Sequence, residues 1–129
     1  MPPIDQLQRV PEYHVDGLVR QGIFTTGLLL EVSETPTRRQ YLADQINATT
    51  NDINEWRDEA LLLNLASFGA DEQALFTQAG IVGLSDLLRF DLDSFGERLQ
   101  RAARVLGVDP PADLIVEGWW EQAHTLREE

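Results

Sequence analysis

The feature that most constrains this chain is an internal repeat with a period of about sixty residues. Residues 18–23 (LVRQGI) align with residues 76–81 (FTQAGI), and the leucine pair 29–30 aligns with the pair 87–88 at the same offset of 58. A chain that contains one supersecondary unit twice is expected to fold both copies on the same backbone plan. The structure of one half therefore constrains that of the other.

Further matches follow in the same order along the chain. Arg38 aligns with Arg98 at an offset of 60, and Asn47 aligns with Gly107 at the same offset. Asparagine and glycine are the residues that most readily adopt the left-handed conformation that ends a helix. The segment IxxWxxxA at residues 53–60 aligns with VxxWxxxA at offset 63. These matches predict one domain over residues 1–129, made of two repeats at about 4–63 and 64–126 that share one core.

The spacing of apolar residues predicts that both repeats are helical. One stripe with three- and four-residue spacing consists of Ile53, Trp56, Ala60 and Leu61. Thr35-Pro36 is typical of a helix start, and Pro110-Pro111 is a helix stop that precedes a final helix at about 112–126. We therefore expect an all-α fold of about eight short helices. Each repeat would contain a hairpin of two short helices around Gly-Ile, then a longer helix, then the tryptophan helix.

The charge balance limits the classes of ligand that the chain can bind. Of its 129 residues 22 are acidic and 10 are basic, and every basic residue is arginine. A net charge of -12 disfavours nonspecific binding to nucleic acid or to an anionic membrane, although it leaves room for a local basic patch. The first residues lack the basic and apolar regions of a signal peptide, and no apolar run approaches the ~20 residues that span a bilayer. We therefore expect a cytoplasmic protein.

Motifs for catalysis or for cofactor binding do not emerge from the sequence. The chain contains no cysteine, which removes thiolate ligands and cysteine nucleophiles. His14 and His124 are isolated and are predicted to be surface residues, because neither has the spacing of a metal site or a catalytic triad. We expect no enzymatic activity, no metal and no cofactor.

The hairpin segments resemble the helix-hairpin-helix motif, in which glycine, an apolar residue and glycine precede a Gly-Ile pair. The second copy has Ser67-Phe68-Gly69 and then 80–81 (GI), whereas the first has residues 9–11 (RVP) and then 22–23 (GI). Gly69 is the one hairpin glycine retained of the four that the motif implies.

More widely, the chain resembles a family of tandem helix-hairpin-helix domains known as DUF4332, a domain of unknown function. The resemblance covers about residues 4–126. It rests on the hairpins, on the arginine-containing helix at 37–43 (TRRQYLA) and on the tryptophan helix at 53–61 (INEWRDEAL). It implies a fold and no established activity.

In DNA-binding proteins with this motif, the hairpin glycines bring backbone N–H groups close to a phosphate. Here Pro11 has no N–H group to donate, and acidic residues flank both hairpins. We therefore favour a packing role for the hairpins. The alternative is binding of a DNA or RNA backbone through the second hairpin, with Ser67, Phe68, Gly69, Arg98, Arg101 and Arg104 as candidate residues. For these arginines we favour a solvated face that forms ion pairs with Glu97 and neighbouring acids.

The function that we expect is a non-catalytic protein-interaction or scaffolding module of degenerate helix-hairpin-helix type, with a protein partner. Trp119 and Trp120 are the candidate contact residues. Adjacent helical residues point about 100° apart, so the two indoles cannot share one narrow stripe. The repeat places Trp119 in the core opposite Trp56, and it places Trp120 at the position of Arg57, which predicts greater exposure. An exposed tryptophan is a strong anchor at protein interfaces. The open alternative is that the last helix buries both indoles.

Overall fold

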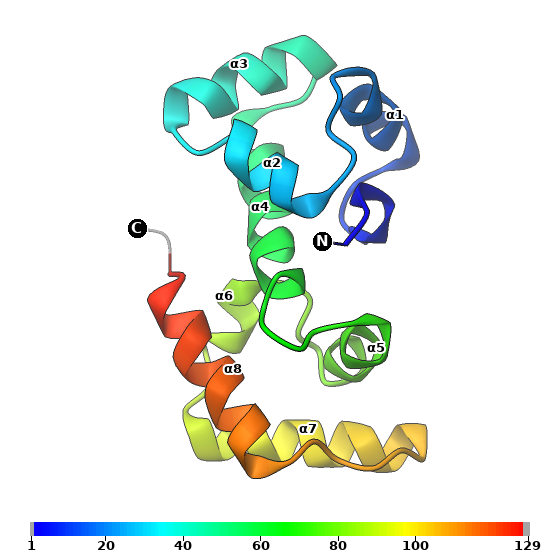
Figure 1. The fold of residues 1–129 in the computed structure, drawn as a ribbon, viewed down its shortest axis with the longest axis vertical. Coiled ribbons are helices and arrows are strands. Elements are labelled where there is room, and N and C mark those ends of the chain that lie inside the picture. The colour runs from blue at the N-terminus through cyan, green and yellow to red at the C-terminus, as the bar shows by residue number, and fades with distance from the viewer. Residues whose placement is uncertain (1, 128–129) are drawn as a thin grey trace. The chain divides into compact units, whose positions relative to one another are not determined.

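Eight α-helices and one short 3-10 helix account for the regular structure of residues 2–127, which are the residues that this computed structural model describes (Figure 1). They divide into two compact units, Met1–Asn64 and Leu65–Glu129. The first unit contains η1 (Ile4–Gln6), α1 (Glu12–Arg20), α2 (Thr26–Val32), α3 (Pro36–Ile46) and α4 (Thr50–Leu63). The second contains α5 (Ala70–Gln78), α6 (Leu84–Leu87), α7 (Leu92–Leu106) and α8 (Asp113–Thr125).

The prediction of an all-α fold with about eight helices is confirmed. Residues 2–127 contain no strand, and one isolated bridge joins Pro3 to Thr25. The final helix begins after Pro110-Pro111, as predicted, and its N-cap is Ala112. The helix-hairpin-helix identity of the turns and the sharing of one core by the two repeats stay predictions.

Capping residues set where the longer helices of the first unit begin. Thr35 accepts the backbone N–H of Arg38 at 3.2 Å, and Pro36 lies in the first turn of α3, as the sequence predicted. Thr49 and Asp52 form a reciprocal capping box at the start of α4. Two orphan N–H groups of that helix are thereby satisfied.

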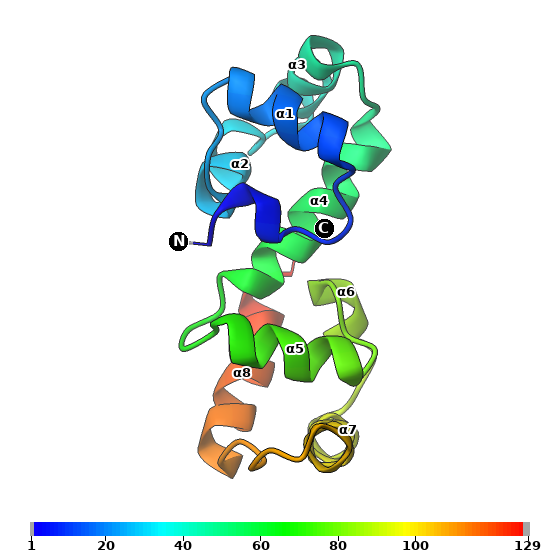
Figure 2. The same cartoon turned by 90° about the vertical axis from the view of Figure 1, so that its right-hand side faces the viewer.

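Helix α4 is the centre of the first unit, because α2 and α3 both pack against it (Figure 2). Its buried face carries Ile53, Trp56 and Ala60, which belong to the predicted stripe and are at most 2% exposed. Each large apolar side chain that is fully buried in this way contributes roughly 1.5–3 kcal/mol relative to an exposed one.

The second unit contains an aromatic core that is centred on Phe76 of α5. The rings of Phe68, Phe95 and Trp119 meet the Phe76 ring edge-on, with centroids 4.8, 5.7 and 5.2 Å away. Edge-to-face pairs at these separations are favourable beyond the area that they bury. They join α5 to α7 and α8 within this unit.

The corners that the repeat predicted have the same backbone conformation in both units. Gly22 and Gly80 have φ values of 81° and 80°, while Asn47 and Gly107 have φ values of 59° and 69°. Gly22 and Gly80 follow the C-cap residues of α1 and α5, whereas Asn47 and Gly107 are themselves the C-caps of α3 and α7. The left-handed helix ends predicted at Asn47 and Gly107 are therefore confirmed.

The surface position predicted for His14 is wrong. The His14 side chain is 6% exposed, its ring centroid lies 5.1 Å from that of Trp56, and its Nδ1 atom has no hydrogen-bond partner among the described residues. His14 lies one helical turn before the buried Leu18, so both residues belong to the inner face of α1. His124 is half-buried, and its Nδ1 lies 2.8 Å from the carbonyl oxygen of Trp120.

We expect Gly107→Ala to lower the free energy of unfolding by about 1–2 kcal/mol, because an L side chain in the left-handed conformation meets its own backbone. A Cβ atom at Gly107 would meet no other atom within 4 Å, so this cost comes from the backbone alone. Gly118→Ala is the matched control, since Gly118 is helical with equally open space. There we expect stabilisation by up to about 1 kcal/mol. Urea unfolding of both variants measures the difference, and equal effects would contradict the assignment.

Candidate functional site

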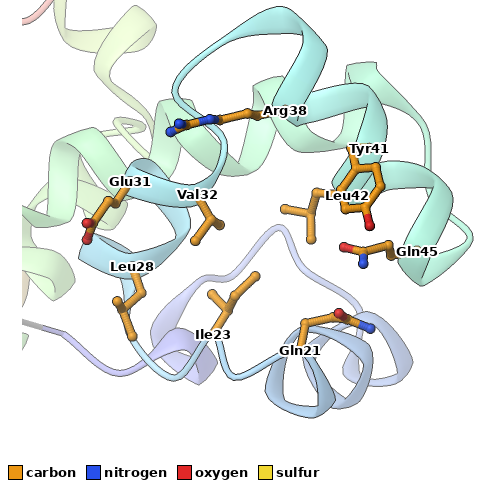
Figure 3. A pocket seen from close by; sticks show the side chains of 9 residues that line it. All are labelled: Gln21, Ile23, Leu28, Glu31, Val32, Arg38, Tyr41, Leu42 and Gln45. Carbon is orange, nitrogen blue, oxygen red and sulfur yellow. The ribbon is translucent and has the colours of Figure 1, made fainter.

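The first unit contains a groove of about 470 Å³, which we name the α2–α3 groove (Figure 3). It lies between α2, α3 and the turn that follows α1. Its lining residues are Gln21, Ile23, Leu28, Glu31, Val32, Arg38, Tyr41, Leu42 and Gln45. This volume is in the range of typical ligand pockets, which measure roughly 300–1,000 Å³.

The α2–α3 groove has an apolar floor and a polar rim. Figure 3 shows the side chains of Ile23, Val32 and Leu42 pointing into the space between the two helices. Arg38 lies at one end of this space, and Gln45 lies near Gln21 at the other. Gly22 adopts the left-handed conformation, and the turn brings the side chain of Ile23 into the floor of the groove. The groove therefore depends on a turn that both repeats share.

Tyr41 and Val32 are the apolar lining residues that remain open to solvent. The side chain of Tyr41 is 67% exposed and that of Val32 is 39% exposed. Arg38 is also exposed, and it contacts Glu34 with an N–O distance of 3.9 Å, which is too long for strong pairing at the surface. A partner could therefore reach both the apolar floor and the guanidinium. Sequence reasoning did not find this groove, because its residues come from three segments whose packing fixes the hollow.

The loop that precedes α1 in the first unit is held by a carboxylate of the same unit. Glu59 of α4 is 1% exposed, and it accepts the backbone N–H of Gln8 at 2.7 Å and that of Arg9 at 2.9 Å. Burial raises the pKa of Glu59, and the two backbone N–H donors and the charge of Arg9 partly offset this shift. The loop N–H groups are thus occupied by an anion that belongs to the protein.

The loop that precedes α5 in the second unit is bound in a similar way. Gln122 of α8, which aligns with Glu59 at offset 63, accepts the backbone N–H of Ala66 at 3.0 Å, and Ala66 aligns with Gln8 at offset 58. The N–H of Gly69, the donor of the nucleic-acid hypothesis, is bound to Glu72 Oε1 at 2.8 Å. A phosphate that approached Gly69 would have to displace this carboxylate.

The structure does not bring the candidate phosphate-binding residues together. Gly69 is the N-cap of α5, whereas Arg98 and Arg101 line a hollow with residues 78–79 at the opposite end of α5. Ser67 is exposed with a φ of 59°. Phe68 packs against the aromatic core, 6.1 Å from Trp119.

Arg98, Arg101 and Arg104 are exposed on α7. Within residues 2–127 none of these three forms an ion pair, so the expected pairing with Glu97 is absent.

The two adjacent tryptophans of α8 have different environments. Trp119 is 3% exposed, and its indole N–H donates to the carbonyl of Ala66 at 2.8 Å, so its predicted place in the core is confirmed. Its ring has no free face to offer a partner. Trp120 is more exposed, as predicted, but it is half-buried, and its N–H donates to the carbonyl of Phe90 at 3.0 Å.

The prediction for Trp120 assumed that its repeat equivalent, Arg57, is exposed, and this assumption is wrong. Arg57, its repeat equivalent, is itself buried at 4% exposure. It donates to the carbonyl of Leu30 at 2.8 Å and to the hydroxyl of Ser33 at 2.6 Å. Arg57 and Trp120 therefore both donate a hydrogen bond to the segment at or after the end of the second helix of their unit. An arginine can be buried at this position of the repeat because its guanidinium finds acceptors there.

Two properties of residues 2–127 bear on the type of site. No three or more histidine or acidic side chains gather closely enough to hold a metal ion. None of the helices combines the length and the apolar character that a membrane crossing requires.

Replacing Glu59 by glutamine tests the loop closure. The amide has one acceptor oxygen for two N–H donors, so we expect a loss of about 1–3 kcal/mol in unfolding free energy at pH 7. The folded-state pKa of Glu59 lies above its usual 4.5, so the folded state binds this proton more tightly than the unfolded state. The contribution of Glu59 to stability is therefore greatest in acid, and it falls as pH rises from 4.5 through the raised value.

Urea unfolding of the parent and of Glu59→Gln across this pH range measures the difference, which should narrow as pH rises. Glu55→Gln is the control, because Glu55 is an exposed acid of the same helix and its replacement should change stability by less than about 0.5 kcal/mol. A difference that is independent of pH would contradict the assignment.

Comparison with known proteins identifies the family of the chain. No curated protein and no solved structure matches it. Residues 10–126 match the family described as "Domain of unknown function (DUF4332)", which spans nearly the whole of both units, and the chain therefore belongs to that family.

Proposed function

We propose that this protein is a non-catalytic protein-interaction module and that the α2–α3 groove is its contact site. The observation that carries the proposal is the composition of this groove, in which the exposed side chains of Val32 and Tyr41 lie between two helices and are bordered by a few polar side chains. Such hollows accept apolar anchor residues of a partner, while the polar rim orients the partner.

The occupant that fits best is a protein segment that carries one or two apolar anchors flanked by basic residues. The groove volume of about 470 Å³ suits a large side chain or two smaller ones. The protein has a net charge of -12, so a basic segment would be attracted at long range. At the rim, Glu31 would meet a basic flank of the partner, and Gln21 and Gln45 would bond to its backbone.

The tryptophans of α8 have less to contribute to such an interface. The indole of Trp119 lies in the core, and the N–H of Trp120 is already bound to the carbonyl of Phe90. A hot-spot residue gains its energy by entering a partner's pocket, and the packing and N–H bonds of these two indoles within their own unit oppose this. We therefore propose the same function that we expect from the sequence, with its protein-contact site in the first unit.

Nucleic-acid binding is the alternative function. The observation in its favour is that the arginines of α7 are exposed and form no ion pair within the described range 2–127. Against it stand the net charge of -12 and the Gly69 N–H group, which Glu72 already occupies. A gel-shift assay with single- and double-stranded DNA and RNA at low salt discriminates between the two functions. Salt-sensitive retardation that Gly69→Glu abolishes would favour nucleic acid.

Peptide-display selection against the whole chain tests the groove. We expect enriched peptides with apolar anchors and flanking arginine or lysine, and we expect Tyr41→Glu to weaken the binding of the selected peptides at least about tenfold, because it places a charge beside the apolar floor. Tyr13→Glu is the matched control, since Tyr13 is a tyrosine of the same unit, is 70% exposed, and does not line the groove. Equal loss in both variants, or no enrichment, would overturn the proposal.

A further inference from the structure

The second unit has a hollow at the position that corresponds to the α2–α3 groove, and we name it the arginine hollow. It is lined by Gln78, Ala79, Arg98, Arg101, Ala102 and Val105. The repeat aligns Ala79 with Gln21 of the groove, Ala102 with Leu42, and Arg98 with Arg38. The two hollows therefore come from one place in the repeated unit.

The residues that line the two hollows differ most in chemical character at one aligned position. Offset 60 aligns Tyr41, the exposed aromatic residue of the groove, with Arg101 of the arginine hollow. The volume falls from about 470 Å³ to about 110 Å³, which is the space of roughly four water molecules. The second hollow is too small for a large apolar anchor, and it suits one small polar group.

The charges around α7 are separated between two sides of the helix. The acids of its first half, Asp93 and Glu97, line a different hollow together with Asp113 and Glu117 of α8. No carboxylate is among the residues that line the arginine hollow. Within residues 2–127 neither Arg98 nor Arg101 has an ion pair, in a chain with 22 acidic residues. Two guanidinium groups thus share a small hollow without a counter-ion from residues 2–127.

The guanidinium of Arg98 is also held in place before any ligand binds. Its guanidinium carbon lies 5.1 Å from the ring centroid of Phe90, a cation–π arrangement. The carbonyl of Phe90 is in turn held by the indole N–H of Trp120 at 3.0 Å. An arginine that is stacked on a fixed ring loses less side-chain freedom when it binds an anion.

From this juxtaposition we infer that the arginine hollow binds a single carboxylate group, with Arg98 and Arg101 as the ligand-binding residues. Guanidinium groups bind carboxylates through paired, charge-assisted hydrogen bonds. One isolated anionic group fits better than a polyanion, because the net charge of -12 repels an extended phosphate backbone. That the carboxylate comes from a partner protein's acidic side chain rests on the proposed function, whereas the binding itself does not.

The test uses NMR titration of the whole, isotope-labelled chain, with the arginine Nε–H signals as the readout. The probe is N-acetylglutamate amide, which carries one carboxylate, and N-acetylglutamine amide is its neutral control. We expect saturable shifts at Arg98 and Arg101 with the acid and none with the amide. Arg101→Gln should weaken binding at least about tenfold, the effect of losing one charge-assisted contact.

Arg104→Gln is the matched control, because Arg104 is exposed on the same helix and does not line the hollow. Its replacement should leave the titration unchanged. The inference is overturned if all arginines shift alike without saturation, which would indicate a general ion atmosphere. It is also overturned if inorganic phosphate or an oligonucleotide binds the hollow more tightly than the carboxylate. Because the probe has no apolar anchor, these outcomes are independent of whether peptides bind the α2–α3 groove.

Discussion

The last helix of each unit reaches back to bind the backbone of its first loop, and the rest of the unit depends on this contact. In the first unit the acceptor is the carboxylate of Glu59, and in the second it is the amide oxygen of Gln122. Pro11 contributes no donor to the loop of the first unit. In both units the fourth helix supplies an acceptor for N–H groups of the loop backbone, which otherwise need one from solvent.

The turn of the repeat keeps one backbone conformation in both units, while the surface beside it differs between them. The turn at Gly22 or Gly80 still delivers an isoleucine to the interior, because the left-handed conformation is retained in both units. The surface beside that turn has then diverged. One copy has an open apolar groove that contains Tyr41, and the other has a small hollow that contains Arg101.

The sequence predicted the local features of the fold well. Helix ends at Asn47 and Gly107, the start at Thr35-Pro36 and the stop at Pro110-Pro111 follow from backbone preferences of single residues. Burial of Trp56 followed from the spacing of apolar residues, and burial of Trp119 followed from its alignment with Trp56 in the repeat. Histidine 14 and Arg57 were misjudged, because burial of a polar residue depends on which helix packs against it, and such contacts join residues far apart in the chain. The α2–α3 groove was missed for the same reason.

The hydrogen bonds from Gln8 and Arg9 to Glu59 have a consequence for how the first unit opens. They join segments 50 and 51 residues apart, so they link the two ends of this unit directly. Displacing the loop breaks its hydrogen bonds to Glu59 of α4, and fraying of α4 at Glu59 breaks the same bonds. Local unfolding of this unit should therefore be cooperative, and the backbone amides of the loop and of α4 should exchange their hydrogens at similar rates.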